Sequence, residues 1–122
     1  SDGTVSGAIS HSCCLTAMDL DAKAIIAATT SGHTARVISR FRPACPILAV
    51  TTTERVCRRL KLYWGVVPYI AETGVSTDAL FEMCVRTAKM ADIANNGDTV
   101  VITAGVPVGI SGTTNLIKAQ IL

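Results

Sequence analysis

A short segment rich in hydroxyl groups has the composition of a phosphate-binding loop. It consists of Thr29, Thr30, Ser31, Gly32, His33 and Thr34. An apolar run precedes this segment and a helical pattern follows it, so its amides lie at the start of a helix. Such amides point outward and the helix dipole favours an anion. Serine or threonine hydroxyls then add further hydrogen-bond donors to the phosphate-binding site. The same residue types also make ordinary turns and caps, so this loop alone is a weak signal.

A second loop of similar composition lies between residues 105 and 115. It contains Ser111, Gly112, Thr113 and Thr114, and it follows another apolar run. In an open parallel sheet, ligands bind where the carboxyl ends of strands meet at a reversal of strand order. Two such loops at one reversal favour phosphate binding over simple capping. We expect His33 to contact an anion or to hold a plain loop position, because no carboxylate or thiol that would make it a base is nearby in sequence.

The motifs of catalytic and metal sites are incomplete in this sequence. There is no Gly-x-x-x-x-Gly-Lys-Ser/Thr loop for a nucleotide, and no serine stands in a Gly-x-Ser-x-Gly elbow. His11 with Cys13 and Cys14 invites a metal site, but a tetrahedral site needs a second ligand cluster, so helix packing is the better interpretation. We therefore predict no catalytic residue and no metal ligand.

Length and composition indicate one small domain. The 122 residues can bury a single core, and no apolar stretch is long enough to cross a bilayer. The five cysteines are odd in number and fall inside apolar or helical patterns, which fits reduced thiols in the cytoplasm. The first residues lack a basic secretory start and an initiator methionine, so we expect a piece of a longer protein.

Basic residues are concentrated in the middle of the chain. Residues 36–61 hold seven of the eleven lysines and arginines against the single acid Glu54, although the formal net charge is only +2. This asymmetry could mark a face that binds nucleic acid or protein. The favoured interpretation is the polar sides of two neighbouring surface helices, because no aromatic residues alternate with the bases.

Hydrophobic periodicity predicts strands that alternate with helices. The expected strands are 24–28, 47–50, 66–70, 99–103 and 116–122, and the expected helices are 5–20, 33–41, 53–61 and one that Ser76 caps. The first helix would bury Val5, Ile9, Cys13 and Leu20, and the second would bury Val37, Ile38 and Phe41. Pro68 indicates an edge strand. In the fourth helix, Glu82 and Arg86 should form an ion pair on the solvent-exposed face.

This alternation predicts an α/β fold with three α/β/α layers. Right-handed crossovers give a mainly parallel five-stranded sheet of order 3-2-1-4-5, with the last strand antiparallel at an edge. The reversal of strand order then falls between the first and fourth strands, where the two hydroxyl-rich loops begin.

Five separated motifs support a family assignment. They are Ser31-Gly32-His33-Thr34-Ala35 with Arg40-Phe41-Arg42-Pro43, Pro46-Ile47-Leu48-Ala49-Val50-Thr51, Trp64-Gly65-Val66, Gly97-Asp98-Thr99-Val100-Val101 and Ser111-Gly112-Thr113-Thr114-Asn115. In order and spacing, the chain resembles the carboxyl-terminal domain of pyruvate kinase over essentially its whole length. The resemblance implies a single regulatory domain over residues 1–122, cut from a homotetrameric cytoplasmic enzyme of glycolysis.

The resemblance also implies what this domain does and lacks. The parent enzyme transfers a phosphoryl group between phosphoenolpyruvate and ADP on a β/α barrel with Mg²⁺ and K⁺, so the piece alone should be inactive. In regulated members of the family, a Thr-x-Ser-Gly-x-Ser/Thr loop grips an effector phosphate, which carries over to Thr29, Ser31, Gly32 and Thr34. The implied partners are this effector, the barrel of the same chain and further subunits, with no nucleic acid and no membrane.

Two departures from the family pattern bear on the effector. Members that take fructose 1,6-bisphosphate often have Gly-Trp-Arg-Pro-Gly in the second loop and an arginine on the preceding helix. This chain has Ala104-Gly105-Val106-Pro107 and Leu80 at those places. A monophosphate such as AMP, ribose 5-phosphate or glucose 6-phosphate is therefore a candidate, and so is inorganic phosphate or sulfate. A purely structural role and a nucleic-acid or protein-binding role for residues 36–61 stay open.

Overall fold

Strands and helices alternate along the chain as the sequence predicts. The computed structural model describes residues 3–72, 76–105 and 114–122. The elements are α1 (Val5–Asp19), β1 (Ala24–Ala28), α2 (His33–Arg40), β2 (Ile47–Thr51), α3 (Glu54–Leu60), β3 (Val66–Ile70), α4 (Thr77–Met90), β4 (Thr99–Gly105) and β5 (Thr114–Ile121). Threonine or serine hydroxyls cap three of the helices, at Thr4, Thr53 and Ser76.

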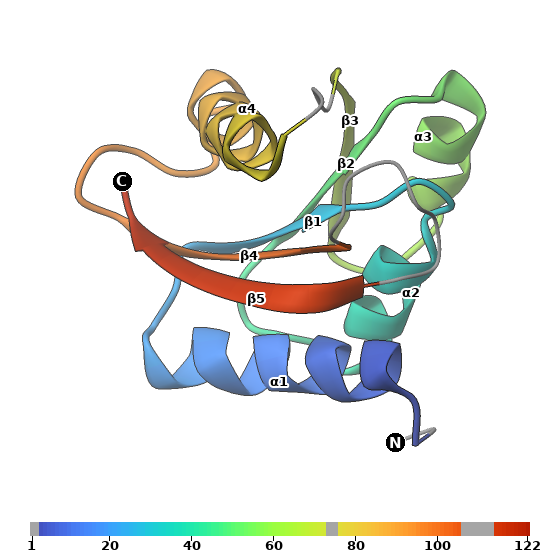
Figure 1. The fold of residues 1–122 in the computed structure, drawn as a ribbon, viewed down its shortest axis with the longest axis horizontal. Helices are drawn as coiled ribbons and strands as arrows, with labels where there is room; N and C mark the ends of the chain where they lie inside the picture. Colours follow the sequence, from blue (N-terminus) through green and yellow to red (C-terminus); the bar gives the residue numbers. More distant parts are fainter. Residues whose placement is uncertain (1–2, 73–75, 106–113) are drawn as a thin grey trace.

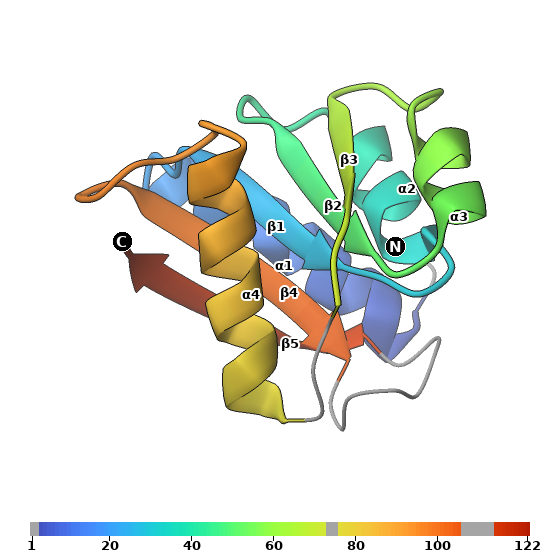
Figure 2. The same ribbon diagram turned by 90° about the horizontal axis from the view of Figure 1, so that it is seen from above.

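One five-stranded sheet organises the molecule, and its strand order is β3-β2-β1-β4-β5 (Figure 1, Figure 2). The pairs β1–β2, β1–β4 and β2–β3 are parallel, whereas β4–β5 is antiparallel. The predicted fold class, strand order and antiparallel last strand are therefore confirmed. Pro68 lies in β3 at one edge of the sheet, as a residue without an amide donor requires.

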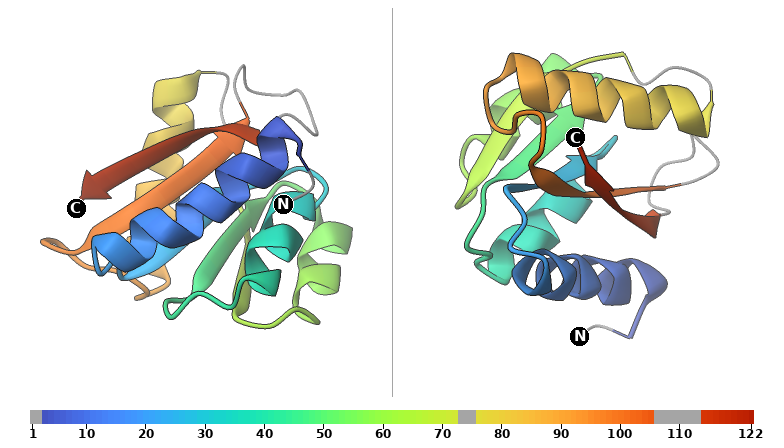
Figure 3. Two further views of the ribbon diagram at one scale, coloured as in Figure 1. Left: turned by 90° about the horizontal axis from the view of Figure 1, so that it is seen from below. Right: turned by 90° about the vertical axis from the view of Figure 1, so that its left-hand side faces the viewer.

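Helices cover both faces of the sheet, so each central strand is buried on both sides (Figure 3). Alternate residues of one strand face opposite layers: Ile26 packs in the core under α4, and Ile25 packs in the core with α1, α2 and α3. Continuous burial along β1 and β2 explains why both strands read as unbroken apolar runs.

The buried faces of α1 and α2 agree only in part with the predicted ones, since Cys13 and Ile38 are buried as predicted but other positions are not. Helix α1 buries Gly7, Ser10, Cys13 and Ala17, while Val5 is 67% exposed and Leu20 is 46% exposed. Helix α2 buries Thr34, Ala35, Ile38 and Ser39, and Phe41 is 40% exposed. Small side chains face the sheet because they let the helix axis come close to it, so residue size decided the contact face as much as hydrophobicity did.

No helix in the described part of the chain is long and apolar enough to span a membrane.

The antiparallel strand β5 forms the second edge of the sheet. On its outer end Ile121 is 73% exposed. An apolar side chain at an open strand edge is the kind of feature that another chain can cover.

Candidate functional site

The loop of residues 29–34 leaves the carboxyl end of β1 and leads directly into α2 (Figure 2). Strand β1 lies between β2 and β4, and the chain moves outward through β2 and β3 before it returns to β4. The loop therefore starts at the reversal of strand order, where open α/β sheets bind their ligands. Both the central strand and the helix start that the sequence predicts are present.

Thr29 and Ser31 use their side chains to fold the loop. The Gly32 amide donates to Thr29 Oγ1 at 2.9 Å, and the His33 amide donates to Ser31 Oγ at 3.3 Å. In each case the hydroxyl oxygen accepts, so its own hydrogen remains free to donate to a second group. The loop thus presents hydroxyl donors at the start of a helix, where an anion is favoured.

Gly32 sits in the left-handed region of backbone conformation, with φ at +88°. A Cβ added there would lie 3.0 Å from Leu60 Cδ2 and 3.3 Å from Val56 Cγ1 on α3. Gly32 is therefore required both by the turn and by the close approach of α3 to the loop. Its missing side chain points toward the protein interior.

Thr34 is buried and contacts Thr114 at the first residue of β5. Their Oγ1 atoms lie 2.5 Å apart, and each side chain is less than a tenth exposed. Two residues that the sequence assigned to separate loops are thus brought together. Thr30, Ser31 and His33, in contrast, are exposed at the loop surface.

Part of the predicted site lies outside the described residues. Ser111, Gly112 and Thr113 belong to that part, as do Val106 and Pro107 of the segment that departs from the family pattern. Leu80 is among the described residues. It lies on the buried face of α4, is 2% exposed and packs in the core against the sheet. The α4 position at which the family resemblance led us to look for an arginine is therefore an apolar core position here.

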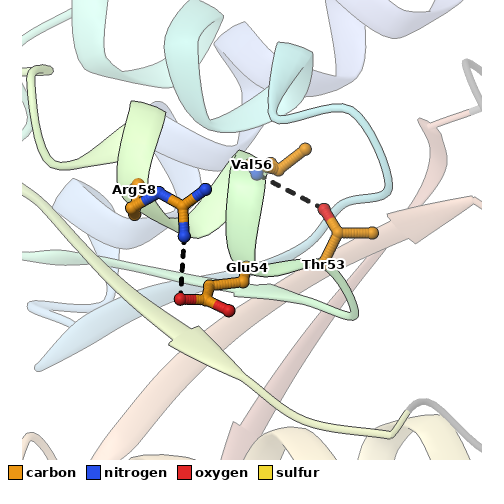
Figure 4. A network of polar contacts seen from close by, with 4 residues as sticks. All are labelled: Thr53, Glu54, Val56 and Arg58. Atoms are coloured by element: carbon orange, nitrogen blue, oxygen red, sulfur yellow. Dashed lines mark hydrogen bonds and ion pairs between the residues drawn. The ribbon is translucent and has the colours of Figure 1, made fainter.

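Three of the seven basic residues between 36 and 61 contact neighbouring side chains in the described part of the chain. Arg58 pairs with Glu54 at 2.7 Å on α3, whose first turn is capped by Thr53 (Figure 4). The predicted ion pair between Glu82 and Arg86 on α4, in contrast, does not form within the described residues. The Arg42 guanidinium lies 4.8 Å from the Trp64 ring centroid, and that of Arg36 lies 5.6 Å from the Tyr63 ring centroid. These contacts account for several of the charges without a nucleic-acid partner.

His11 and the neighbouring thiols lie on α1, where His11 faces Phe41 and Cys13 packs in the core against the sheet. The His11 ring stacks on Phe41 with centroids 4.8 Å apart, and Cys13 is fully buried. Burial raises the pKa of the Cys13 and Cys14 thiols to about 11. Among residues 3–72, 76–105 and 114–122, no three His, Cys, Asp or Glu side chains are arranged to hold a metal ion.

Two polar side chains near the loop have contacts that the sequence did not predict. Thr103 in β4 is buried and donates its hydroxyl to the Leu116 carbonyl at 2.9 Å, which ties β4 to β5. Arg36 has a buried Nε with no hydrogen-bond partner among the described residues. The sequence predicts that Arg36 lies away from the apolar stripe of α2, and in the structure its guanidinium lies over the ring of Tyr63.

Comparisons of the sequence with known proteins show the family of the chain. Residues 7–120 match the family model described as "Pyruvate kinase, alpha/beta domain". Curated relatives named pyruvate kinase include those of Sporosarcina psychrophila (42% identical over 98% of this chain), Clostridium acetobutylicum (47% over 96%) and Lactobacillus delbrueckii subsp. bulgaricus (48% over 97%). The chain spans only 20–25% of the length of these relatives. Because the family model covers residues 7–120 and these relatives are 42–48% identical to the chain, the chain belongs to the pyruvate kinase α/β-domain family.

Proposed function

We propose that residues 1–122 form the carboxyl-terminal regulatory domain of a pyruvate kinase and bind the phosphate group of a metabolite at the loop of residues 29–34. The observation that carries this proposal is the arrangement of Thr29 and Ser31. Both hydroxyls accept from amides of their own loop and keep a free hydrogen, at the start of α2 and at the reversal of strand order. Neutral donors in this place complement a phosphate.

The direct contacts come from the exposed or half-buried residues of the loop. Thr29, Thr30, Ser31 and His33 face the phosphate, and Gly32 lets the backbone turn beneath it. Thr34 makes no direct contact with the phosphate in this proposal, because its hydroxyl is hydrogen-bonded to the hydroxyl of Thr114. Ser111, Gly112 and Thr113, which lie outside the described residues, are included in the proposal as further candidate contacts.

A ligand with one phosphate fits these residues better than a bisphosphate. Leu80 is buried in the core and carries no charge that could reach a second phosphate. The segment after β4 has Gly105 and Val106 where sugar-bisphosphate-binding members often carry a tryptophan and an arginine. AMP, ribose 5-phosphate and glucose 6-phosphate are the candidates, with inorganic phosphate as the minimal ligand.

The parent enzyme supplies the chemistry in this proposal. Phosphoryl transfer between phosphoenolpyruvate and ADP, with Mg²⁺ and K⁺, takes place on a barrel domain outside these residues, in the cytoplasm. The domain described here contributes effector binding and, through the open edge at β5, contacts between subunits. The 122-residue chain alone should show no turnover of phosphoenolpyruvate with ADP, and turnover above the level of a contaminant would contradict the assignment.

Calorimetric titration tests the site. The 122-residue chain is titrated with AMP, ribose 5-phosphate, glucose 6-phosphate, fructose 1,6-bisphosphate and inorganic phosphate. We expect saturable binding of at least one monophosphate, weakened about tenfold to a hundredfold by Ser31→Ala, since one hydrogen bond to a charged acceptor contributes about 1.5 to 3 kcal/mol.

The matched control is Ser76→Ala, which removes a hydroxyl at the start of α4 and far from the loop in sequence. It should leave binding unchanged. If Ser31→Ala binds every ligand as well as the unaltered chain does, the phosphate site is elsewhere or absent. The domain is then a structural and assembly element of its parent enzyme.

A further inference from the structure

The turn that joins α4 to β4 contains Asn96, the one asparagine of this sequence that precedes a glycine. Both Asn96 and Gly97 are exposed, and a Cβ added at Gly97 would meet nothing within 4 Å. In such a pair the backbone nitrogen of the glycine can attack the side-chain carbonyl of the asparagine, because no side chain on the glycine hinders the approach. The chain can therefore modify itself at this place.

The reaction needs only the chain and water. The Gly97 nitrogen forms a bond to Asn96 Cγ, the bond from Cγ to Nδ2 breaks, and Nδ2 leaves as ammonia with the proton that the Gly97 nitrogen gives up. Water then opens the resulting cyclic imide at either of its carbonyl carbons. The product has an aspartate or an isoaspartate at position 96, so a neutral amide becomes a carboxylate.

A hydrogen bond to Leu122 occupies the attacking nitrogen in the folded chain. The Gly97 amide donates to the Leu122 carbonyl at 2.7 Å, and the Leu122 amide donates to the Asp98 carbonyl at 2.8 Å. Figure 1 shows the end of β5 beside the loop between α4 and β4. A hydrogen-bonded amide keeps its proton until the bond opens, which is also why such amides are protected from hydrogen exchange. The attack therefore requires Leu122 to separate from the turn.

The turn itself is held by hydrogen bonds between its first and last residues. The Asp98 amide donates to the Asn95 carbonyl at 3.0 Å, and the Asn95 amide donates to Asp98 Oδ2 at 2.8 Å. Gly97 has a φ of +92°, which suits a glycine at the third position of a turn. These contacts hold the backbone around Asn96 in one conformation, so closure of the imide ring also depends on local opening.

We propose that Asn96 is a deamidation site that Leu122 protects, and that the reaction proceeds while the end of β5 is detached from the turn of residues 95–98. A carboxylate at position 96 lies close in sequence to Asp98, and like charges repel. An isoaspartate also lengthens the backbone of the turn. Both products disfavour the closed turn, so a deamidated chain holds Leu122 less tightly. The inference is independent of phosphate binding at residues 29–34.

The deamidation rate of Asn96 is measured in the folded 122-residue chain and in the same chain unfolded in guanidinium chloride, by peptide mapping with mass spectrometry. We expect the unfolded chain to react roughly tenfold or more faster, because the folded chain is open for only part of the time. The ratio of the two rates should match, within about threefold, the open fraction that hydrogen exchange of the Gly97 amide gives. Asn95 is the internal control. It lies in the same turn but precedes an asparagine, and it should react much more slowly in both states.

Two substitutions separate the backbone hydrogen bonds from side-chain packing. Leu122→Pro removes the amide that donates to Asp98 and should bring the folded-state rate at Asn96 closer to the unfolded rate. Leu122→Ala keeps both backbone bonds and should change the rate less. If the two substitutions change the rate equally, packing holds the turn and the proposal is overturned.

The comparison of the folded and unfolded chains tests the proposal even if neither variant folds. Equal rates at Asn96 in the two states would show that Leu122 protects nothing. A rate at Asn96 no higher than that at Asn95 in the unfolded chain would show that Asn96 is not the site.

Discussion

Thr34 and Thr114 stand 80 positions apart in the chain, and their side-chain oxygens are 2.5 Å apart in the folded domain. Thr34 lies in the first turn of α2, and Thr114 is the first residue of β5. The contact therefore links the helix that follows the phosphate loop to an edge strand of the sheet. Whichever hydroxyl donates, the other must accept, and burial leaves neither of them open to water.

Removing one hydroxyl of this pair should destabilise the fold more than removing both. Thr34→Val and Thr114→Val each leave a buried hydroxyl without its partner, and we expect each to lower the free energy of unfolding by about 1–3 kcal/mol. The double variant replaces both hydroxyls by methyl groups of the same shape and should recover part of that loss. Urea denaturation of the four proteins gives the coupling energy, and simple additivity would show that the contact contributes nothing.

Gly32→Ala should destabilise the domain through α3 as well as through the backbone. The positive φ costs about 1 kcal/mol for a residue with a Cβ, and crowding against Leu60 and Val56 should add about 1–3 kcal/mol. Gly65→Ala is the matched control, because its φ is +70° and a Cβ there would meet nothing within 4 Å. Equal unfolding free energies for the two variants would contradict the packing contribution.

The order of the sheet could be predicted from sequence because each strand has a local signature. Continuous apolar runs mark β1, β2 and β4, and Pro68 marks an edge strand. The rules of right-handed crossover then leave few arrangements. Caps at Thr53 and Ser76 were equally predictable, since a hydroxyl followed by a helical pattern satisfies an amide three residues later.

The contact faces of α1 and α2 could not be predicted in the same way. Periodicity reports which residues are apolar, but close packing selects the small residues Gly7, Ala17 and Ala35 and leaves Val5 outside. The contact between Thr34 and Thr114 could not be predicted from the sequence either, because it depends on the register of β5 against β4. Long-range contacts of this kind have no signature in either segment alone.

Buried thiols should make the domain less stable at alkaline pH. Burial raises the pKa of Cys84 from its ordinary value of 9.0 to about 12. Below pH 9 the thiol is neutral in both states, but between pH 9 and about 12 only the unfolded chain loses the proton. Its ionisation lowers the free energy of unfolding by up to about 1.4 kcal/mol per pH unit.

Cys84→Ala isolates this contribution. The variant lowers stability at every pH because it leaves a small cavity, but its free energy of unfolding should fall less steeply between pH 9 and 11 than that of the unaltered chain. Urea denaturation under reducing conditions at several pH values measures the two slopes. Parallel slopes would show that Cys84 titrates alike in the folded and unfolded states.

Self-association of the domain should depend on Ile121 at the open edge of the sheet. Strand β5 pairs with β4 on one side, and Ile121 is 73% exposed. A lysine on an edge strand disfavours pairing with another strand, because its charge would have to be buried or placed beside a like charge. We therefore expect Ile121→Lys to weaken association at least tenfold in sedimentation equilibrium. Leu62→Lys is the matched control, since Leu62 is 84% exposed but follows α3, far from β5 in the strand order. If the unaltered chain stays monomeric at high concentration, or if both variants weaken association equally, β5 is not the edge through which this domain assembles.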